Sequence, residues 1–209
     1  LGPSDQICQR QGIRGLYTST LFQYNERFLQ KLGGKGVELG RSFVRPEYQK
    51  SFTPLLLLWK GIGVWICRNP QYSVLFGPVS ISNDYTSISR QLMVSYFTER
   101  EPASELAAMV RARHPFWINP LSRQHGLPVW DIEELSAVIA DIETDGKGLP
   151  VLLRQYLKLG GKLVGFNVDK QFANALDGLI VVNLRSTEPR VLERYMGKAE
   201  AAAFLAAKA

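Results

Sequence analysis

The sequence contains few of the residues from which metal sites and hydrolase active sites are built. It has two cysteines, Cys8 and Cys67, and two histidines, His114 and His125, among 209 residues. None of them stands at the spacing of a zinc motif such as CxxC or HExxH, so we expect no metal. A small disulfide-stapled fold is excluded too, and a Ser-His or Cys-His hydrolase would need one of the two histidines in the right place.

A secretory start and a long apolar run are also missing. The longest apolar stretch runs from Pro54 to Cys67 and is interrupted by Lys60, whereas a membrane span needs about 20 residues. The first residues lack the basic start and apolar run of a signal peptide. We therefore predict a cytoplasmic protein without a transmembrane segment, and leave open a peripheral position on the inner face of the membrane.

The overall composition is that of a globular protein, but the charge is unevenly distributed. Hydrophobic residues make up 45% of the chain and charged residues 21%, which excludes a disordered chain. The net charge of +6 arises in the first 70 residues, which hold ten lysines and arginines against four acidic residues. A localised basic surface favours an anionic partner, and scattered solvated lysines are the alternative. Nucleic acid is disfavoured because no recognisable binding motif is present.

One part of the chain has the pattern of a strand, a helix and a second strand. The strands are expected at residues 36–45 and 72–81, with Pro78 marking a bulge or an edge in the second. The helix between them spans 53–67, is apolar nearly all round and begins with Thr53 as a cap. This order predicts a right-handed crossover and a parallel pair of strands.

Further helices and strands follow from the same kind of pattern. Their expected positions are helices at 87–99, 102–113, 131–143 and 150–159, strands at 162–168 and 178–184, and an alanine-rich surface helix at 198–209. The start of the helix at 131–143 is well marked, because Asp131 is followed three residues later by Glu134, as in a capping box. Asp177, which precedes Gly178, is expected to form a turn before the last strand, with a catalytic acid as the alternative.

The first of the expected strands breaks the alternation of a regular strand. Its apolar residues fall out of phase by Val44, and a one-residue bulge near Gly40 would restore the pattern. Such a bulge would place Glu38 and Arg41 on one side and expose backbone N–H groups. These donors could polarise a thioester carbonyl while the carboxylate accepts a proton from an attacking amine. The alternative is an ordinary strand with a surface ion pair.

The loop after this strand is suited to a phosphorylated group. It leads into the N-terminus of the apolar helix, where free N–H groups and the helix dipole attract phosphate, and Lys50 adds a positive charge. The chain contains neither GxGxxG nor GxxxxGK[ST], so no nucleotide-binding loop is predicted.

Several segments, in the same order along the chain, resemble a known family. They are Glu38–Val44, Pro46–Tyr48 with the Leu-Leu-Trp-Lys-Gly-Ile run that follows, Leu75–Ser82, Pro150–Gly161 and Phe166–Asp169. Over roughly residues 15–196 the chain resembles the acyl-carrier-dependent branch of the GNAT superfamily. That branch includes ornithine-lipid and glycine-lipid N-acyltransferases and proteins once labelled hemolysins, and it is related to acyl-homoserine-lactone synthases.

The resemblance implies an α+β fold, a GNAT-like central mixed sheet with flanking helices. Residues 1–197 would form the later part of such a domain, with a helical insertion at about 100–146, and 198–209 would form a helical tail. Leu1 would lie near the end of the third strand of the fold. We therefore expect that the early strands are missing from this chain and that it is the C-terminal part of a larger acyltransferase.

The resemblance also implies roles for individual residues. Glu38 would be the general base, and Arg41 would pair with a substrate carboxylate or with Glu38. Tyr85 would protonate the departing thiolate, with a core tyrosine as the alternative. Arg90 would bind an amino-acid carboxylate, with a structural ion pair as the alternative. The thioester and its phosphopantetheine would lie against Gly40, Ser42, Tyr48, Gln49, Lys50, Ser51 and Phe52.

From these roles we expect an N-acyltransferase of aminolipid synthesis. It would move a fatty, 3-hydroxylated acyl group from the phosphopantetheine thioester of acyl carrier protein to the amine of a small amino acid. Acyl-CoA is the alternative donor, but the pyrophosphate signature Q/RxxGxG/A is absent. A different interpretation is a non-catalytic GNAT-like module that docks for a fused glycerolipid O-acyltransferase. The aromatic segment 116–118, close in sequence to three arginines, would be a membrane anchor or a lid over an acyl tunnel.

Overall fold

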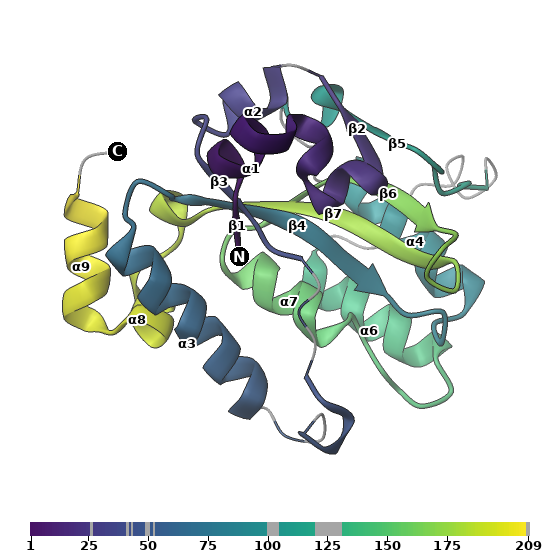
Figure 1. The fold of residues 1–209 in the computed structure, drawn as a ribbon. Helices are drawn as coiled ribbons and strands as arrows, with labels where there is room; N and C mark the ends of the chain where they lie inside the picture. Colours follow the sequence, from purple (N-terminus) through teal and green to yellow (C-terminus); the bar gives the residue numbers. More distant parts are fainter. Residues whose placement is uncertain are drawn as a thin grey trace.

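A five-stranded mixed sheet forms the centre of the molecule (Figure 1). The computed structural model describes residues 1–25, 27–40, 42, 44–48, 51, 53–99, 105–119 and 131–207. In spatial order the strands are β1 (Gly2–Pro3), β3 (Gly36–Glu38), β4 (Val74–Ile81), β7 (Ala175–Asn183) and β6 (Lys162–Asp169). Strands β3 and β4 are parallel, and the other neighbouring pairs are antiparallel.

The larger hydrophobic core lies between one face of the sheet and six helices, which are labelled in Figure 1. These helices are α3 (Thr53–Arg68), α4 (Ser87–Glu99), α6 (Ile132–Ile142), α7 (Val151–Lys158), α8 (Pro189–Met196) and α9 (Lys198–Ala206). Helices α3 and α8 pack closely, because a Cβ atom at Gly63 would lie 2.8 Å from the carbonyl oxygen of Tyr195. The helix that follows β3 is therefore held in place by the C-terminal helices.

A smaller core covers the opposite face of the sheet and comes mainly from the first 32 residues. Its elements are α1 (Ser4–Gln11), η1 (Ile13–Gly15), η2 (Tyr17–Thr20), β2 (Phe22–Tyr24), α2 (Arg27–Lys31), η4 (Ala107–Met109) and β5 (Val110–Ala112). Strands β2 and β5 pair antiparallel as a small second sheet. Phe22 and Phe28 are fully buried there, and Phe28 meets the ring of Phe76 edge-on. Short 3-10 turns η3 (Pro46–Tyr48) and η5 (Leu184–Ser186) complete the described elements.

The predicted mixed α/β fold and most of its elements are confirmed. The crossover from β3 through α3 to a parallel β4 is present, and the helix predicted at 87–99 is α4. Helix α6 begins as predicted, because the carboxylate of Asp131 accepts a hydrogen bond of 2.8 Å from the backbone N–H of Glu134. These elements have strong local signals, which is why the sequence alone located them.

Two expectations were wrong. The α-helix predicted at 102–113 is absent from its described part, because Val110–Ala112 instead pair with β2 as strand β5, so the insertion at 100–146 is not purely helical. Asp177 does not form a turn, because it lies within β7 and is paired on both sides. The tail forms a surface helix as predicted, and Ala201 and Phe204 on its inner side pack into the larger core.

Candidate active site

The two parallel strands part after Leu39. Their last hydrogen bond between described residues runs from the N–H of Leu39 to the carbonyl oxygen of Phe76, at 2.7 Å. Strand β4 continues to Ile81 paired with β7. The residue of β4 that next faces β3 is Pro78, which has no N–H to continue the ladder. Of the strand predicted at 36–45, Gly36–Glu38 form β3, and the bulge expected near Gly40 remains a prediction because Arg41 and Phe43 lie outside the described residues.

The parting leaves an apolar cavity of about 130 Å³ beside β3. Its walls include Leu39 and Ser42 from the segment after β3, Leu58, Trp59 and Ile62 from α3, and Tyr156 from α7. Leu58 is partly exposed, so the cavity lies near the surface of the molecule on that side. An apolar space next to the parting of two parallel strands is suited to an acyl thioester.

Glu38 lies at this edge but faces away from the cavity. Val37 and Leu39 point into the larger core, so Glu38 points to the opposite face of the sheet. Its buried carboxylate accepts hydrogen bonds from the backbone N–H of Tyr17 at 2.9 Å and of Thr18 at 2.7 Å, and from the Thr18 hydroxyl at 2.6 Å. These three hydrogen bonds connect β3 to the start of η2.

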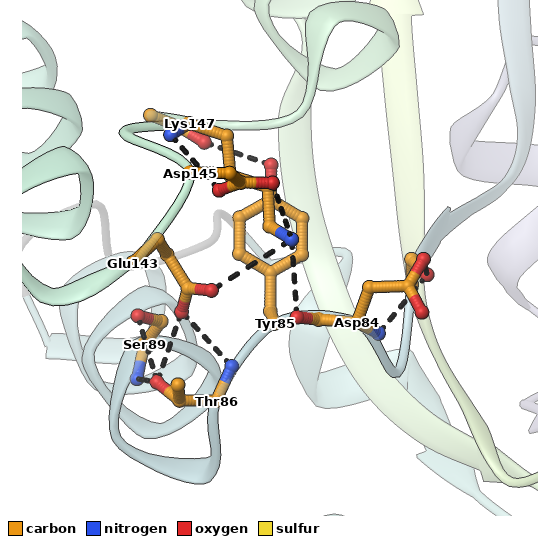
Figure 2. A network of polar contacts seen from close by, with 9 residues as sticks. Asp84, Tyr85, Thr86, Ser89, Glu143, Asp145 and Lys147 are labelled. Carbon is orange, nitrogen blue, oxygen red and sulfur yellow. Dashed lines mark hydrogen bonds and ion pairs between the residues drawn. The ribbon is translucent and has the colours of Figure 1, made fainter.

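Tyr85 lies in the loop after β4, where Figure 2 shows it among polar side chains. Its hydroxyl donates a hydrogen bond of 2.7 Å to the carbonyl oxygen of Gly148, and the ammonium group of Lys147 lies 4.8 Å from the ring centroid. Burial, followed by the negative charge of Glu143, raises the pKa of the Tyr85 hydroxyl. Its proton is thus retained near neutral pH and is shared with a backbone carbonyl group.

Sequence reasoning missed Glu143, which fixes the start of α4 (Figure 2). Its buried carboxylate accepts hydrogen bonds of 2.9 Å from both the backbone N–H and the hydroxyl of Thr86. A hydrogen bond from Ser89, and then those from Thr86, lower the pKa of Glu143. The two partners lie 57 residues apart, so no local pattern could have found the pair.

Arg90 is anchored to the loop that follows β4. One of its guanidinium nitrogens, Nη1, donates a hydrogen bond of 2.9 Å to the side-chain oxygen of Asn83. Its Nε atom is buried and has no hydrogen-bond partner among the described residues. Half-buried Arg90 therefore sits where the chain leaves β4, and its binding of a substrate carboxylate remains a prediction.

Comparisons with known proteins agree with this geometry. Residues 1–59 match the family described as Acetyltransferase (GNAT) domain. A protein named Glycine N(alpha)-acyltransferase from Bacteroides thetaiotaomicron is 25% identical over 190 residues, covering 86% of this chain and 56% of the relative. A protein of the same name from Phocaeicola vulgatus is 34% identical over 91 residues, covering 41% of this chain and 28% of the relative. These matches support a GNAT N-acyltransferase.

The matches cover only part of each relative. The matched part of the chain spans 56% of the length of one curated relative and 28% of the other. No solved structure matches the chain. The GNAT match includes β3 and the first residues of α3 but ends before β4, so it covers only the segment in which the candidate site begins.

Part of the predicted thioester site of the GNAT region is described. Gly40 and Ser42 lie directly after the parting, and Ser42 lines the cavity. Tyr48 and Ser51 are exposed, and the Ser51 hydroxyl accepts a hydrogen bond of 3.3 Å from the N–H of Thr53 at the start of α3. Four other predicted residues lie outside the described residues: Arg41, Gln49, Lys50 and Phe52.

The GNAT-like sheet also holds a buried acid that sequence reasoning set aside. Asp177 is 3% exposed and accepts a hydrogen bond of 2.6 Å from the Ser80 hydroxyl on β4. Burial raises the pKa of Asp177, Ser80 partly opposes the rise, and the charge of Asp169 adds to it. Ser80, Asp177 and Asn167 are cross-strand neighbours, so they form a polar row across three strands.

The aromatic segment 116–118 is divided between surface and interior. Trp117 is 68% exposed, whereas Phe116 and Ile118 line a cavity of about 360 Å³ together with α4 and β6. None of the described helices is both long and apolar enough to cross a bilayer. The described residues likewise contain no group of three or more His, Cys, Asp or Glu side chains that could hold a metal ion.

Proposed function

We propose that this chain is the part of an N-acyltransferase that moves a fatty acyl group from a phosphopantetheine thioester to the amine of a small amino acid. The observation that carries the proposal is the parting of β3 and β4 beside an apolar cavity. The GNAT match over residues 1–59 and the names of the two relatives support the same reaction type. We place the product among the aminolipids, as in the ornithine-lipid and glycine-lipid branch that the sequence resembles.

In this reaction the neutral amine attacks the thioester carbonyl carbon. A C–N bond forms, the C–S bond breaks, the nitrogen loses a proton and the departing thiolate gains one. We propose Glu38 as the proton acceptor, as the resemblance implies. Because its carboxylate faces away from the cavity and is held by Tyr17 and Thr18, the amine proton would reach it through a water molecule. The proton donor in our proposal is Tyr85, whose hydroxyl is protonated near neutral pH. Arg90 would bind the carboxylate of the amino acid.

The donor in our proposal is acyl carrier protein rather than coenzyme A. Carrier proteins are acidic, and the excess of lysine and arginine lies in the first 70 residues. Among these residues, Lys60 and Arg68 are exposed on α3 and Arg45 is exposed before it. Arg45 precedes, and α3 follows, the segment in which the sequence predicts the phosphopantetheine contacts. A peripheral contact with the inner face of the membrane, for which exposed Trp117 is suited, is part of the same proposal.

A transfer assay tests the proposal directly. The full-length parent protein is incubated with acyl carrier thioesters or acyl-CoA and a panel of amino acids that includes glycine, and products are detected by mass spectrometry. We expect an acyl-amine product, formed faster from the carrier thioester. Binding of the carrier protein without any acyl-amine, for every acceptor, would contradict the proposal and favour the docking-module alternative.

A further inference from the structure

A buried carboxylate on the central sheet has no cation beside it. Asp177 on β7 is 3% exposed, and one of its oxygens, Oδ1, accepts the hydrogen bond of 2.6 Å from the Ser80 hydroxyl. No described residue donates a hydrogen bond to the other oxygen, Oδ2, and no lysine or arginine among the described residues forms an ion pair with the carboxylate. Buried carboxylates are usually paired with a cation or held by several donors. The second oxygen of Asp177 is therefore able to accept a hydrogen bond from a ligand.

The Ser80–Asp177 pair lies on the face of the sheet opposite the cavity beside β3. Val79 on β4 and Leu176 on β7 belong to the larger core, so their neighbours Ser80 and Asp177 point to the other face. Glu38 points to this same face. A thioester in the cavity and an amine beside Asp177 would thus approach each other from opposite faces of the sheet.

The pair also lies beside the part of β4 that β3 no longer covers. Ser80 comes two residues after Pro78, where the ladder between β3 and β4 ends, a distance of about 7 Å along the strand. On its β3 side this part of β4 is paired with none of the residues that the structure describes, and Ser80 is exposed. A ligand can therefore reach the pair from solvent, and the short distance to the parting suits a small acceptor.

A purely structural role does not explain the charge of Asp177. Burial raises the pKa of its carboxyl group, and the hydrogen bond from Ser80 only partly opposes the rise. The ionised carboxylate thus lowers stability at neutral pH, whereas an asparagine could accept the same hydrogen bond without this cost. Groups that lower stability are often retained because they bind a ligand. A bound ammonium group would compensate the charge of this carboxylate.

We infer that the Ser80–Asp177 pair binds the amino group of the acceptor in its ammonium form. The inference rests on the proposed function and adds to it the residues that hold the amine. Oδ2 of Asp177 accepts a charge-assisted hydrogen bond from the ammonium group. The Ser80 hydroxyl donates its hydrogen to Asp177 and accepts a second bond from the ligand. Asp177 is thus a binding residue, and Glu38 on the same face remains the proposed proton acceptor.

The binding test compares two ligands that differ only at the amino group. Dissociation constants of glycine and of glycolate, which has a hydroxyl group in its place, are measured by NMR titration of the full-length parent protein. We expect the wild-type protein to prefer glycine. Asp177→Asn should weaken the binding of glycine by about ten- to hundredfold without weakening that of glycolate. Since this variant is expected to be at least as stable as wild type, unfolding would not account for the loss.

Transfer kinetics give a second measurement, and a neighbouring acid provides the control. Asp177→Asn should raise the KM for the amino acid and leave the KM for the carrier thioester unchanged. Asp169 on β6 points to the same face, but its Oδ1 accepts hydrogen bonds of 2.9 Å and 3.2 Å from the N–H groups of Gln171 and Phe172. We expect Asp169→Asn to keep both KM values and the preference for glycine.

Three results would overturn the inference. They are equal affinity of the wild-type protein for glycine and glycolate, unchanged glycine affinity in Asp177→Asn, and an equal loss of glycine affinity in Asp169→Asn. Absence of all transfer by the wild-type protein, with the effect of Asp177→Asn on glycine binding intact, would contradict the proposed function alone.

Discussion

The backbone N–H of Thr86 donates a hydrogen bond of 2.9 Å to the carboxylate of Glu143, 57 residues later in the chain. The bond places a negative charge at the first turn of α4, where the helix dipole favours it. It also fixes the loop that carries Tyr85 and connects β4 to the insertion (Figure 2). The pair therefore links the loop after β4 to the end of α6.

Glu143→Gln should lower stability at neutral pH. The pKa of Glu143 is lowered in the folded protein below its ordinary value of 4.5, so its ionised form contributes stability above that value. This contribution is lost as the pH falls through the folded pKa, where the wild-type group becomes protonated. Urea unfolding at pH 7 and below pH 4.5 should show a difference between variant and wild type that shrinks in acid. Asp145→Asn, at an exposed side chain that pairs with Lys147, should have little effect at either pH.

Asp177→Asn should have the opposite effect on stability. The pKa of Asp177 in the folded protein is raised above its ordinary value of 3.8. The folded protein is therefore more stable with Asp177 protonated, and the ionised carboxylate lowers its stability at neutral pH. The amide removes this cost and can still accept a hydrogen bond from Ser80. We expect a higher urea midpoint than wild type at pH 7, with the advantage lost as the pH falls below the folded pKa. A variant less stable than wild type at pH 7 would contradict the inference that the ionised, buried carboxylate of Asp177 lowers the stability of the protein.

Gly77→Ala should separate β3 from β4 and reduce both stability and activity. A Cβ atom at Gly77 would overlap the carbonyl oxygen of Leu39, which is backbone and cannot move aside cheaply. We expect a loss of about 2 kcal/mol or more in the free energy of unfolding. Gly61→Ala is the matched control, because a Cβ atom at this exposed position of α3 would meet no other described atom within 4 Å. Alanine at this position should raise the free energy of unfolding by about 0.5–1 kcal/mol.

Glu38→Gln distinguishes a proton acceptor from an anchor. If Glu38 accepts the proton, kcat should fall by about 10²–10⁴-fold, whereas Thr18→Val should mainly lower stability because it removes one donor to the carboxylate. Single-turnover acyl transfer and thermal unfolding of both variants provide the comparison. Equal losses of activity in the two variants would identify Glu38 as a residue that anchors η2 to β3.

Features of the fold that depend on residues close together in the sequence were predictable, and features that depend on distant residues were not. The start of α6 was predictable because Asp131 and Glu134 are three residues apart, and helix α3 because its apolar run is bounded by Thr53. The length of β3 was not predictable from its own residues. It is limited by Pro78, which lies on the neighbouring strand and comes 40 residues after Glu38.

The candidate site shows the same division. Glu38 and Ser42 were indicated by their place in a motif, and the structure puts them at the edge where the strands part. The pair of Ser80 and Asp177 could not be found from the sequence, because the two residues lie 97 positions apart and meet only when β4 pairs with β7. Such features depend on packing between residues far apart in the sequence, which local sequence patterns do not predict.

The close packing of Gly63 against Tyr195 has a consequence for how the protein is made. The wall that α3 contributes to the cavity beside β3 is held by helices that leave the ribosome long after α3 itself. A nascent chain that stops short of α8 therefore presents the apolar surface of α3 to water or to a chaperone. Synthesis must proceed past Met196 before the pocket can assume its binding shape.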